Sequence, residues 1–517
     1  MIFEERQIEK NNFSLRATLL FGLMILGLFA VLFQVFSLQI SGYTEYQLAA
    51  LNNKNYAVPV QSLRGEIFDR NGKALIKNEP TFDLITRPNL IDDIDSFIEK
   101  IQPVIFLSEN EISKYKKLQK EKAFVNKELV LKKDLSAEEI ARFNVRSFNF
   151  QNAFIAQRHR RISDYPEIFS HVLGYTSRIE NDFESMPEIP RSHWKDTELV
   201  YAHGLIQGQT GLEQVYDDYL SGQHGKRLYE MNARGQFVQS LSFTQPAKGS
   251  DLYTNLDIDA QKSAAKFLGN RKGAVVAIDL ESGGINVLYS SPTYSINELS
   301  NGMSENNFQT LLNDADKPFF NRALQGRYPP ASTIKPAIGM YGLSNNIVSW
   351  DFEIKDPGFF TLPETGRVFR GWRKGGHGKV NMHKAFLVSS NTYFFSLAYQ
   401  ADIGELSNHL SSLGFGQKVC LDCFEEDPAF VPTPEWKYSI MNAGWVKGDT
   451  VNLGIGQGYL VATPMQLANY AALLATKGLY AEPSLVAITN QKKPLKTWQD
   501  ERFDNSDWAK MHQAFLG

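Results

Sequence analysis

Ser332 and Lys335 lie three residues apart in the stretch Y-P-P-A-S-T-I-K-P, Tyr328–Pro336. If a helix begins here, this spacing puts both side chains on one face, a turn apart, with their ends able to meet. A serine hydroxyl becomes a nucleophile once a base removes its proton, and a lysine is such a base when burial or nearby charge lowers its pKa. The helix amino end would also favour developing negative charge. The pattern is typical of a nucleophile with its base.

An ordinary helix start has the same pattern, with Ser332 as a plain N-cap and Lys335 facing solvent. Ser-x-x-Lys is common in this chain, since it also begins at Ser113, Ser192 and Ser263. Further signals are therefore needed to favour chemistry at this position.

A second polar group, Ser389 and Asn391, stands in the run F-L-V-S-S-N-T-Y-F-F. Polar residues inside a core-like run cost free energy unless they are paired or functional. Downstream, three glycines predict tight backbone before a helix start at Thr463-Pro464. They are Gly454, Gly456 and Gly458.

The elements around these residues combine helices and strands. A helix ending near Leu268 precedes two β-rich runs in Gly273–Pro292, which predict an antiparallel hairpin around Glu281–Gly284. Met465–Thr476 predicts a helix with an alanine-rich apolar face. The second half therefore reads as α/β or α+β.

The first half has different signals. Gln61–Leu75 predicts a strand that runs into a hairpin turn at Asn71-Gly72. Ser136 and Glu139 predict a capping box that opens a helix. We interpret this half as a separate, elongated module.

Length and composition limit the class of protein. A chain of 517 residues predicts two or three domains, and 43% hydrophobic with 21% charged residues is ordinary for folded proteins. The net charge of −3 offers no broad basic surface, which argues against a nucleic-acid partner.

Ala17–Ile40 contains no Asp, Glu, Lys or Arg. As a helix it would extend about 36 Å, enough to cross a bilayer. A cleaved signal peptide and a buried core helix are the alternatives, and the length of the run disfavours the first. Arg6, Lys10 and Arg16 precede it, so the amino terminus is expected in the cytoplasm.

Cys420 and Cys423 are the two cysteines. They predict either a tight local disulfide, if the compartment is oxidising, or two small apolar residues on a strand or loop. A zinc site would need two more ligands close by.

Taken together, these motifs resemble the penicillin-binding, serine transpeptidase family, and the resemblance covers nearly the whole chain. The motifs are R-G-E-I-F-D-R-N-G, G-Q-T-G-L-E-Q-V-Y (Gly208–Tyr216), Y-P-P-A-S-T-I-K-P, the Ser-Ser-Asn triplet, P-E-W-K (Pro434–Lys437) and G-D-T-V-N-L-G-I-G-Q-G (Gly448–Gly458). The run Arg367–Val380 is most similar to the penicillin-binding protein 2 branch of class B.

The resemblance implies an α+β architecture in which a pedestal carries a β-lactamase-like transpeptidase domain of helices packed on an antiparallel sheet. The expected segments are a cytoplasmic tail (1–16), a transmembrane helix (17–40), a pedestal of the dimerisation type (41–247) and the transpeptidase domain (248–517). The chain would sit in the bacterial inner membrane with its catalytic domain in the periplasm.

The resemblance also implies a function, the cross-linking of peptidoglycan stem peptides during cell-wall elongation. Ser332 would attack the carbonyl between two terminal D-alanines and form an acyl-enzyme, which an amine from a neighbouring stem would resolve. Lys335 would take and return the proton, Ser389 would relay protons, and Asn391 would bind the donor peptide. β-Lactams would trap Ser332, no cofactor is expected, and a membrane glycan polymerase is the expected partner.

Two departures from the family pattern matter. Neither Lys-Ser-Gly nor Lys-Thr-Gly, the family's third motif, occurs in the 517 residues. We therefore expect a transpeptidase domain that is incomplete at its carboxyl end. Three alternatives stay open: a non-catalytic partner of a glycan polymerase, an inactive fragment, and a β-lactam sensor or hydrolase.

The second departure concerns metal. Some relatives are expected to bind zinc near the Ser-x-Asn motif. Here Asp356 and His377 remain, but Gly371 and Ser390 stand where the other two ligands would be. Two ligands do not make a structural zinc site, so no metal is expected.

Overall fold

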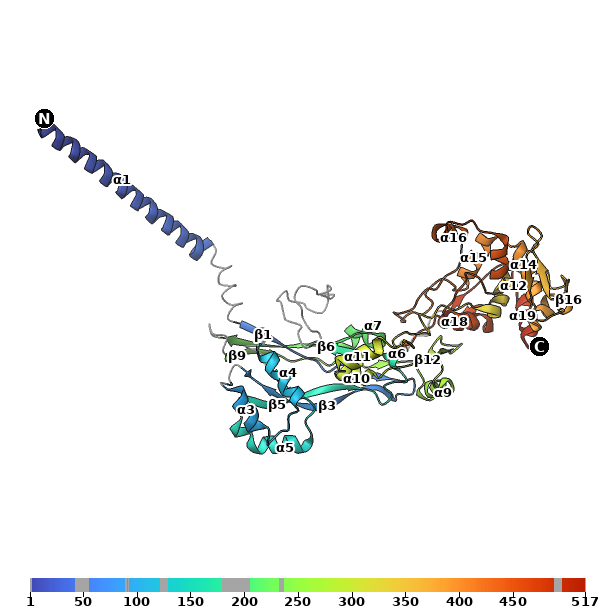
Figure 1. Ribbon diagram of the computed structural model, residues 1–517, viewed down its shortest axis with the longest axis horizontal. Coiled ribbons are helices and arrows are strands. Elements are labelled where there is room, and N and C mark those ends of the chain that lie inside the picture. Colours follow the sequence, from blue (N-terminus) through green and yellow to red (C-terminus); the bar gives the residue numbers. More distant parts are fainter. Residues whose placement is uncertain are drawn as a thin grey trace.

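The computed structural model describes residues 2–41, 55–88, 91, 93–120, 129–178, 205–231, 237–487 and 495–516. Helix α1 (Ile2–Phe36) continues as a π-helical turn, η1 (Ser37–Ser41). Within α1, Ala17–Phe36 has a mean hydropathy of 2.6 and none of its residues is buried. By length and composition it is able to cross a membrane. The predicted apolar helix is confirmed, and α1 lies at one end of the elongated molecule (Figure 1).

Two sheets form the long middle part of the molecule. One sheet has the order β1-β8-β9, and the other has the order β10-β2-β3-β4 with β5 also paired to β3. The strands are β1 (Asn55–Val60), β2 (Ile67–Phe68), β3 (Ala74–Thr86), β4 (Leu129–Lys132), β5 (Ala153–Ile162), β8 (Gly225–Met231), β9 (Phe237–Thr244) and β10 (Leu252–Tyr253). The predicted hairpin is confirmed as β2–β3, and Gly72 adopts the positive φ of 77° that its turn requires.

Helices α3 (Ile94–Ile101), α4 (Glu109–Lys120) and α5 (Ala137–Arg146) accompany the end of this sheet that lies nearer α1 (Figure 1). Ser136 and Glu139 form the predicted capping box at the start of α5. The apolar faces of these helices enclose a small core that includes Ile101, Tyr115 and Phe143.

Short elements α6 (Ser170–Leu173), β6 (Thr176–Arg178), β7 (Ile206–Gly208), α7 (Gly211–Val215) and α8 (Asp217–Ser221) follow. Here the Glu213 carboxylate lies 2.7 Å from both Arg64 Nε and Arg161 Nε, and all three side chains are buried. Buried charges need such pairing, so this cluster joins two of the quoted motifs, one through Arg64 and the other through Glu213.

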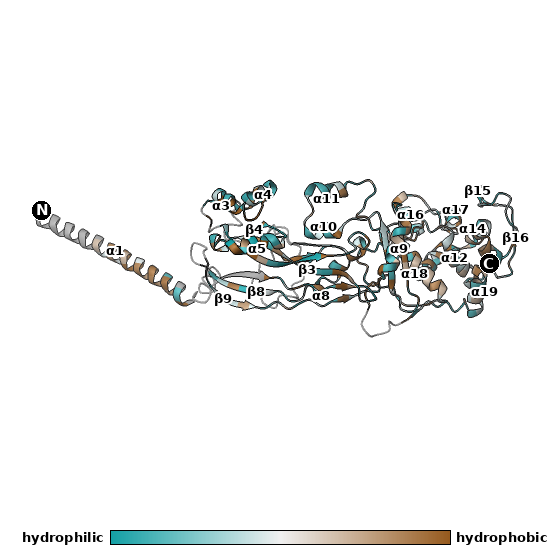
Figure 2. Ribbon diagram, turned by 90° about the horizontal axis from the view of Figure 1, so that it is seen from below, coloured by the Kyte–Doolittle hydropathy of each residue, from teal (hydrophilic) through white to brown (hydrophobic). Residues whose placement is uncertain are grey.

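The second half begins with α9 (Ile258–Leu268) and the antiparallel hairpin of β11 (Gly273–Ile278) and β12 (Ile285–Ser291), as predicted. Two helices follow, α10 (Ile296–Asn301) and α11 (Glu305–Leu312). Figure 2 shows α9 where the elongated part meets the helical part.

The helical part is built around α12 (Lys335–Ser344) and α14 (Asn391–Gln400), whose buried faces supply much of the largest apolar core. The other helices are α13 (Met382–Leu387), α15 (Ile403–Ser412), α16 (Pro434–Met441), α17 (Lys447–Leu453), α18 (Pro464–Ala475) and α19 (Asn505–Leu516). Short strands pair as β13 (Ile354–Asp356) with β16 (Gly378–Val380), β14 (Phe359–Thr361) with β15 (Val368–Arg370), and β17 (Leu479–Tyr480) with β18 (Lys496–Thr497). The predicted helix at Met465–Thr476 is confirmed as α18, and the α+β class is confirmed for the chain.

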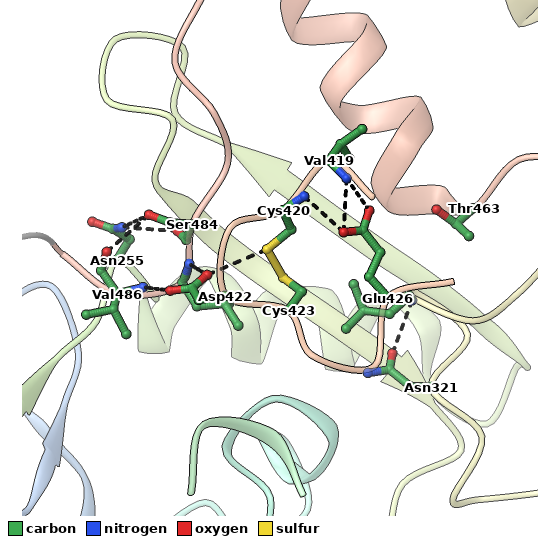
Figure 3. The surroundings of a disulfide bond; sticks show 12 residues. Asn255, Asn321, Val419, Cys420, Asp422, Cys423, Glu426, Thr463, Ser484 and Val486 are labelled. Carbon is green, nitrogen blue, oxygen red and sulfur yellow. Dashed lines mark hydrogen bonds between the residues drawn. A yellow bond between two sulfur atoms is a disulfide. The ribbon is translucent and has the colours of Figure 1, made fainter. Parts of the chain in front are cut away.

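Cys420 and Cys423 form a disulfide, which decides between the two alternatives left open by the sequence. Figure 3 shows Asp422 beside it, facing Val486. Asp422 accepts hydrogen bonds from the backbone N–H groups of Leu485 and Val486 at 2.7 and 2.9 Å. It also accepts one from the hydroxyl of Tyr216, so this loop joins the two halves of the chain.

Candidate active site

Ser332 lies in a 3₁₀ turn, η6 (Ala331–Ile334), that leads directly into α12. Its side chain is exposed, and its carbonyl accepts the backbone N–H of Lys335. Ile334 occupies the N-cap position of α12, so Ser332 is not the plain helix cap that the alternative interpretation required. Pro336 lies in the first turn, where a missing N–H is tolerated.

The glycine run fixes this turn from the opposite side. Ala331 has a φ of 51°, an unusual value for a residue with a side chain, and its N–H donates to the carbonyl of Gly456 over 2.9 Å. Gly456 itself has a φ of 68°, and a Cβ there would lie 2.3 Å from the Ala331 carbonyl oxygen. The predicted tight backbone is confirmed at all three glycines. Gly456 and Gly458 have positive φ values, and a Cβ on Gly454, whose φ is −57°, would lie 2.5 Å from Ala398 Cβ.

Lys335 is 2% exposed and its ammonium group points to the Ser-x-Asn motif. Nζ donates to the Ser389 carbonyl at 2.8 Å, to Ser389 Oγ at 2.9 Å and to Asn391 Oδ1 at 2.7 Å. The ring centroid of Phe394 lies 5.5 Å away. The structure thus brings together three of the four residues expected in the site, and it excludes the alternative of a solvent-facing lysine.

Burial lowers the pKa of Lys335 to about 8. The cause is desolvation of the ammonium group, because the three acceptors around it are uncharged and no ion pair with a carboxylate forms among the residues that the structure describes. A lysine in these surroundings gives up its proton more readily than one in water.

The backbones of Ser332 and Lys335 are joined by a hydrogen bond, yet within the described chain Ser332 Oγ makes no hydrogen bond to Lys335 Nζ. An ammonium group has three donors, and Ser389 and Asn391 accept all of them. The two side chains are therefore not hydrogen-bonded to each other in this structure. The Ser332 side chain is exposed at the surface.

Ser390, between the two expected residues, has a structural partner that sequence reasoning missed. Its hydroxyl donates to Asp356 Oδ2 over 2.8 Å, and both side chains are buried. Burial opposes ionisation of Asp356. The hydroxyls of Thr392 and Ser390 and the Gly358 N–H, in that order, outweigh burial and hold the pKa of the carboxyl below its usual value. A buried serine in an apolar run needs an acceptor, and this signal pointed to such a partner.

The positions considered for zinc have other contacts here. The Asp356 carboxylate accepts the hydrogen bond from Ser390, and the Gly371 N–H donates to the Gly358 carbonyl over 2.8 Å. The ring of His377 lies 5.3 Å from that of Trp372. The residues present do not supply a set of zinc ligands.

The P-E-W-K and G-D-T motifs support the same region. Lys437 Nζ donates to Asp449 Oδ2 at 2.6 Å and to the Gly444 carbonyl at 2.9 Å. Asp449 stands in the first turn of α17, which packs on α14. These motifs therefore hold the helix that starts at Asn391, and they do not reach Lys335.

Comparisons with known proteins agree with this geometry. The family model described as "Penicillin binding protein transpeptidase domain" matches residues 273–516, and the model described as "Penicillin-binding Protein dimerisation domain" matches residues 59–254. The chain therefore belongs to the penicillin-binding proteins. Several of its relatives are named peptidoglycan D,D-transpeptidase MrdA, the penicillin-binding protein 2 group.

Over 516 residues the chain is 35% identical to MrdA of Acinetobacter baumannii, covering 99% of this chain and 75% of that relative. MrdA of Escherichia coli K12 is 31% identical, over 96% and 77%. Among solved structures, penicillin-binding protein 2 of Helicobacter pylori in complex with MreC has a TM-score of 0.74 and 30% identity, covering 89% and 82%. Pseudomonas aeruginosa penicillin-binding protein 2 in complex with WCK 5153 has a TM-score of 0.63 and 28% identity, covering 89% and 80%.

Proposed function

We propose that this protein is a peptidoglycan D,D-transpeptidase that cross-links stem peptides through an acyl-enzyme on Ser332. The single observation that carries the proposal is the buried Lys335 amine, within hydrogen-bond distance of Ser389 and Asn391 and one turn from Ser332. A serine, a desolvated lysine and a second serine form a proton-transfer set that needs no cofactor.

In the proposed reaction, Ser332 Oγ attacks the carbonyl between the two terminal D-alanines. The neutral Lys335 amine accepts the hydroxyl proton, and Ser389 passes a proton to the departing D-alanine amine as the peptide bond breaks. An amine of a second stem peptide then attacks the ester, and its proton returns to Ser332 through the same groups. Asn391 would hold the donor peptide by its amide.

The lowered pKa supports this role for Lys335. With a pKa of about 8, about a quarter of the side chains would be neutral at pH 7.5, compared with about one in a thousand for an ordinary lysine. A base works best when its pKa lies near the working pH.

The same proposal includes the location of the protein in the cell and its partner. Helix α1 would anchor the chain in the bacterial inner membrane, with Arg6, Lys10 and Arg16 keeping the amino terminus in the cytoplasm. The catalytic part would then face the periplasm and act in cell-wall elongation beside a glycan polymerase. β-Lactams, which resemble D-alanyl-D-alanine, would acylate Ser332.

The experiment is penicillin labelling of the detergent-extracted chain, read by intact-mass spectrometry. We expect one adduct on the native chain and none on Ser332→Ala. Ser263→Ala is the matched control, because Ser263 also begins a Ser-x-x-Lys sequence but lies exposed on α9 and donates to the Asp259 carbonyl. An adduct that persists in Ser332→Ala, or a folded native chain without an adduct, would contradict the proposal and favour a non-catalytic role.

A further inference from the structure

A strongly basic segment lies beside the proposed active site and has no role in the chemistry described so far. Between Arg367 and Lys384 the sequence contains no Asp or Glu, although the whole chain has a net charge of −3. The basic residues of this segment are Arg367, Arg370, Arg373, Lys374, Lys379 and Lys384. We call residues 367–380 the basic arm.

The basic arm is an ordered part of the fold. Gly376 lets the arm pack directly on strand β13, because a Cβ at this position would lie 2.1 Å from the Asp356 carbonyl oxygen. Lys384 Nζ donates to the carbonyls of His377 and Lys379 at 3.0 and 2.7 Å. These two hydrogen bonds hold the start of β16 in place. The charges of the arm are therefore presented from a fixed backbone, which limits the entropy lost when a ligand binds.

The basic arm also contacts the catalytic motif directly. Trp372 Nε1 donates to the carbonyl of Val388, the residue before Ser389, over 3.2 Å. On its other side, a Cβ on Gly371 would lie 3.6 Å from the hydroxyl of Thr392, the residue after Asn391. The arm thus flanks both ends of the Ser-x-Asn motif.

Three cations of the arm, Arg370, Arg373 and Lys374, are exposed and have neither an ion pair nor an aromatic partner within the part of the chain that the structure describes. Arg367 also forms no ion pair there, but it lies over the ring of Phe369 at 5.0 Å. Lys379 differs, because it pairs with Glu353 at 2.9 Å. Free guanidinium groups on an ordered loop are suited to bind carboxylates, to which arginine donates two parallel hydrogen bonds.

We propose that the basic arm is a docking surface for the free carboxylates of a peptidoglycan stem peptide, and that Arg370, Arg373 and Lys374 bind them. This inference rests on the proposed function and adds a substrate-positioning surface to it. A membrane surface is the other anionic partner that such a loop would suit, but both views place β16 at the end of the molecule opposite α1 (Figures 1 and 2). The arm is thus remote from the apolar helix and next to the residues that would process the peptide.

The test measures the affinity of the full chain for a soluble disaccharide pentapeptide by isothermal titration calorimetry. The variant Arg370→Gln/Arg373→Gln/Lys374→Gln should bind about fivefold more weakly, the size expected for three exposed charge pairs. Raising the salt concentration should weaken binding to the native chain and affect the variant less. The same peptide with its carboxylates converted to carboxamides should bind native chain and variant alike.

Lys114→Gln/Lys117→Gln, which removes two exposed charges from α4, is the control variant and should bind as the native chain does. Thermal unfolding followed by circular dichroism verifies that each variant is folded. Equal affinity of the folded triple variant and the native chain would overturn the inference, as would charge-dependent binding to phosphatidylglycerol vesicles in place of the peptide. Penicillin labelling of the native chain keeps the two proposals apart, because a Ser332 adduct together with unchanged peptide affinity refutes only the docking surface.

Discussion

Lys335 is a buried cation whose hydrogen-bond partners are all neutral. Its three donors are satisfied by Ser389 and Asn391, so the ammonium group is tolerated in the core, but no carboxylate among the described residues forms an ion pair with it. The loss of hydration therefore acts on the pKa almost unopposed. This arrangement distinguishes Lys335 from Lys437, which is also buried but lies 2.6 Å from Asp449.

The rate of acylation by penicillin should consequently depend on pH. Only neutral Lys335 can accept the Ser332 proton, so the rate should rise with pH through about 8 and level off above it. Stopped-flow acylation between pH 6 and pH 10 measures this profile. Lys335→Arg keeps the charge but does not lose its proton in this range, so it should be inactive throughout, and a flat native profile would contradict the base role.

Ser390→Ala should destabilise the protein by about 1.5–3 kcal/mol at pH 7, because the buried Asp356 carboxylate loses a hydrogen bond. The pKa of Asp356 is lowered in the folded state, so its contribution to stability is present above the unfolded pKa of about 3.9 and is lost as the pH falls through the lower folded value. The difference between variant and native chain should therefore shrink from pH 7 to pH 3 in thermal unfolding. A pH-independent difference would show that Asp356 is not the group affected.

At the scale of elements, the turn that carries Ser332 depends on a distant glycine run. Gly456 follows α17, and its carbonyl receives the N–H of Ala331, whose φ of 51° is maintained by this contact. A residue held in an unfavourable conformation next to a candidate nucleophile indicates that the surrounding structure determines where the hydroxyl points.

Gly456→Ala should lower the rate of penicillin acylation by about a hundredfold, because its Cβ would displace the Ala331 carbonyl and a shift of about 1 Å is enough for such a loss. Gly458→Ala is the matched control. It has a similar φ of 81°, but the nearest atom to its Cβ would be Asn452 Cβ at 3.3 Å, away from the turn. Equal losses in both variants would assign the effect to general strain.

The sequence predicted the elements that depend on local patterns. Capping residues predicted the start of α5, turn residues predicted the β2–β3 and β11–β12 hairpins, and the apolar run predicted α1. Contacts between segments far apart in the chain were not predictable, because spacing along a sequence carries no information about them. The bonds from Ser390 to Asp356 and from Ala331 to Gly456 are of this kind. Ser389 and Asn391 are also distant from Lys335 in the chain, and only the family resemblance placed them in the same site.

At the scale of the whole molecule, the two matched domains share one apolar core. This core combines Phe169 and Leu212 from the dimerisation-domain match with Leu288 and Leu485 from the transpeptidase match. The Tyr216 hydroxyl adds a polar connection to Asp422, 3.1 Å away, and burial together with this carboxylate raises the pKa of Tyr216. A change at this junction should therefore lower the stability of both domains.

Tyr216→Phe should lower the unfolding temperature of the chain by about 1–3 °C, since one hydrogen bond to a charged group is lost in a large protein. Hydrogen exchange should also become faster at Leu485 and Val486, whose N–H groups share the Asp422 carboxylate. Tyr219→Phe, in which the altered side chain is half exposed, is the control and should change neither quantity. If hydrogen exchange at Leu485 and Val486 is unchanged in Tyr216→Phe, the Tyr216 hydroxyl does not help to hold the junction together.

The shared core also bears on how the protein is made. Its members extend from Ile67 to Val486, so some of the residues that enclose the early strands are synthesised long after them. At about 5–20 residues per second, the first apolar strands would wait roughly 20–80 s for their partners. Until the segment around Val486 is made, the nascent chain leaves part of this apolar surface uncovered, and its yield in a cell should depend on chaperones that shield that surface.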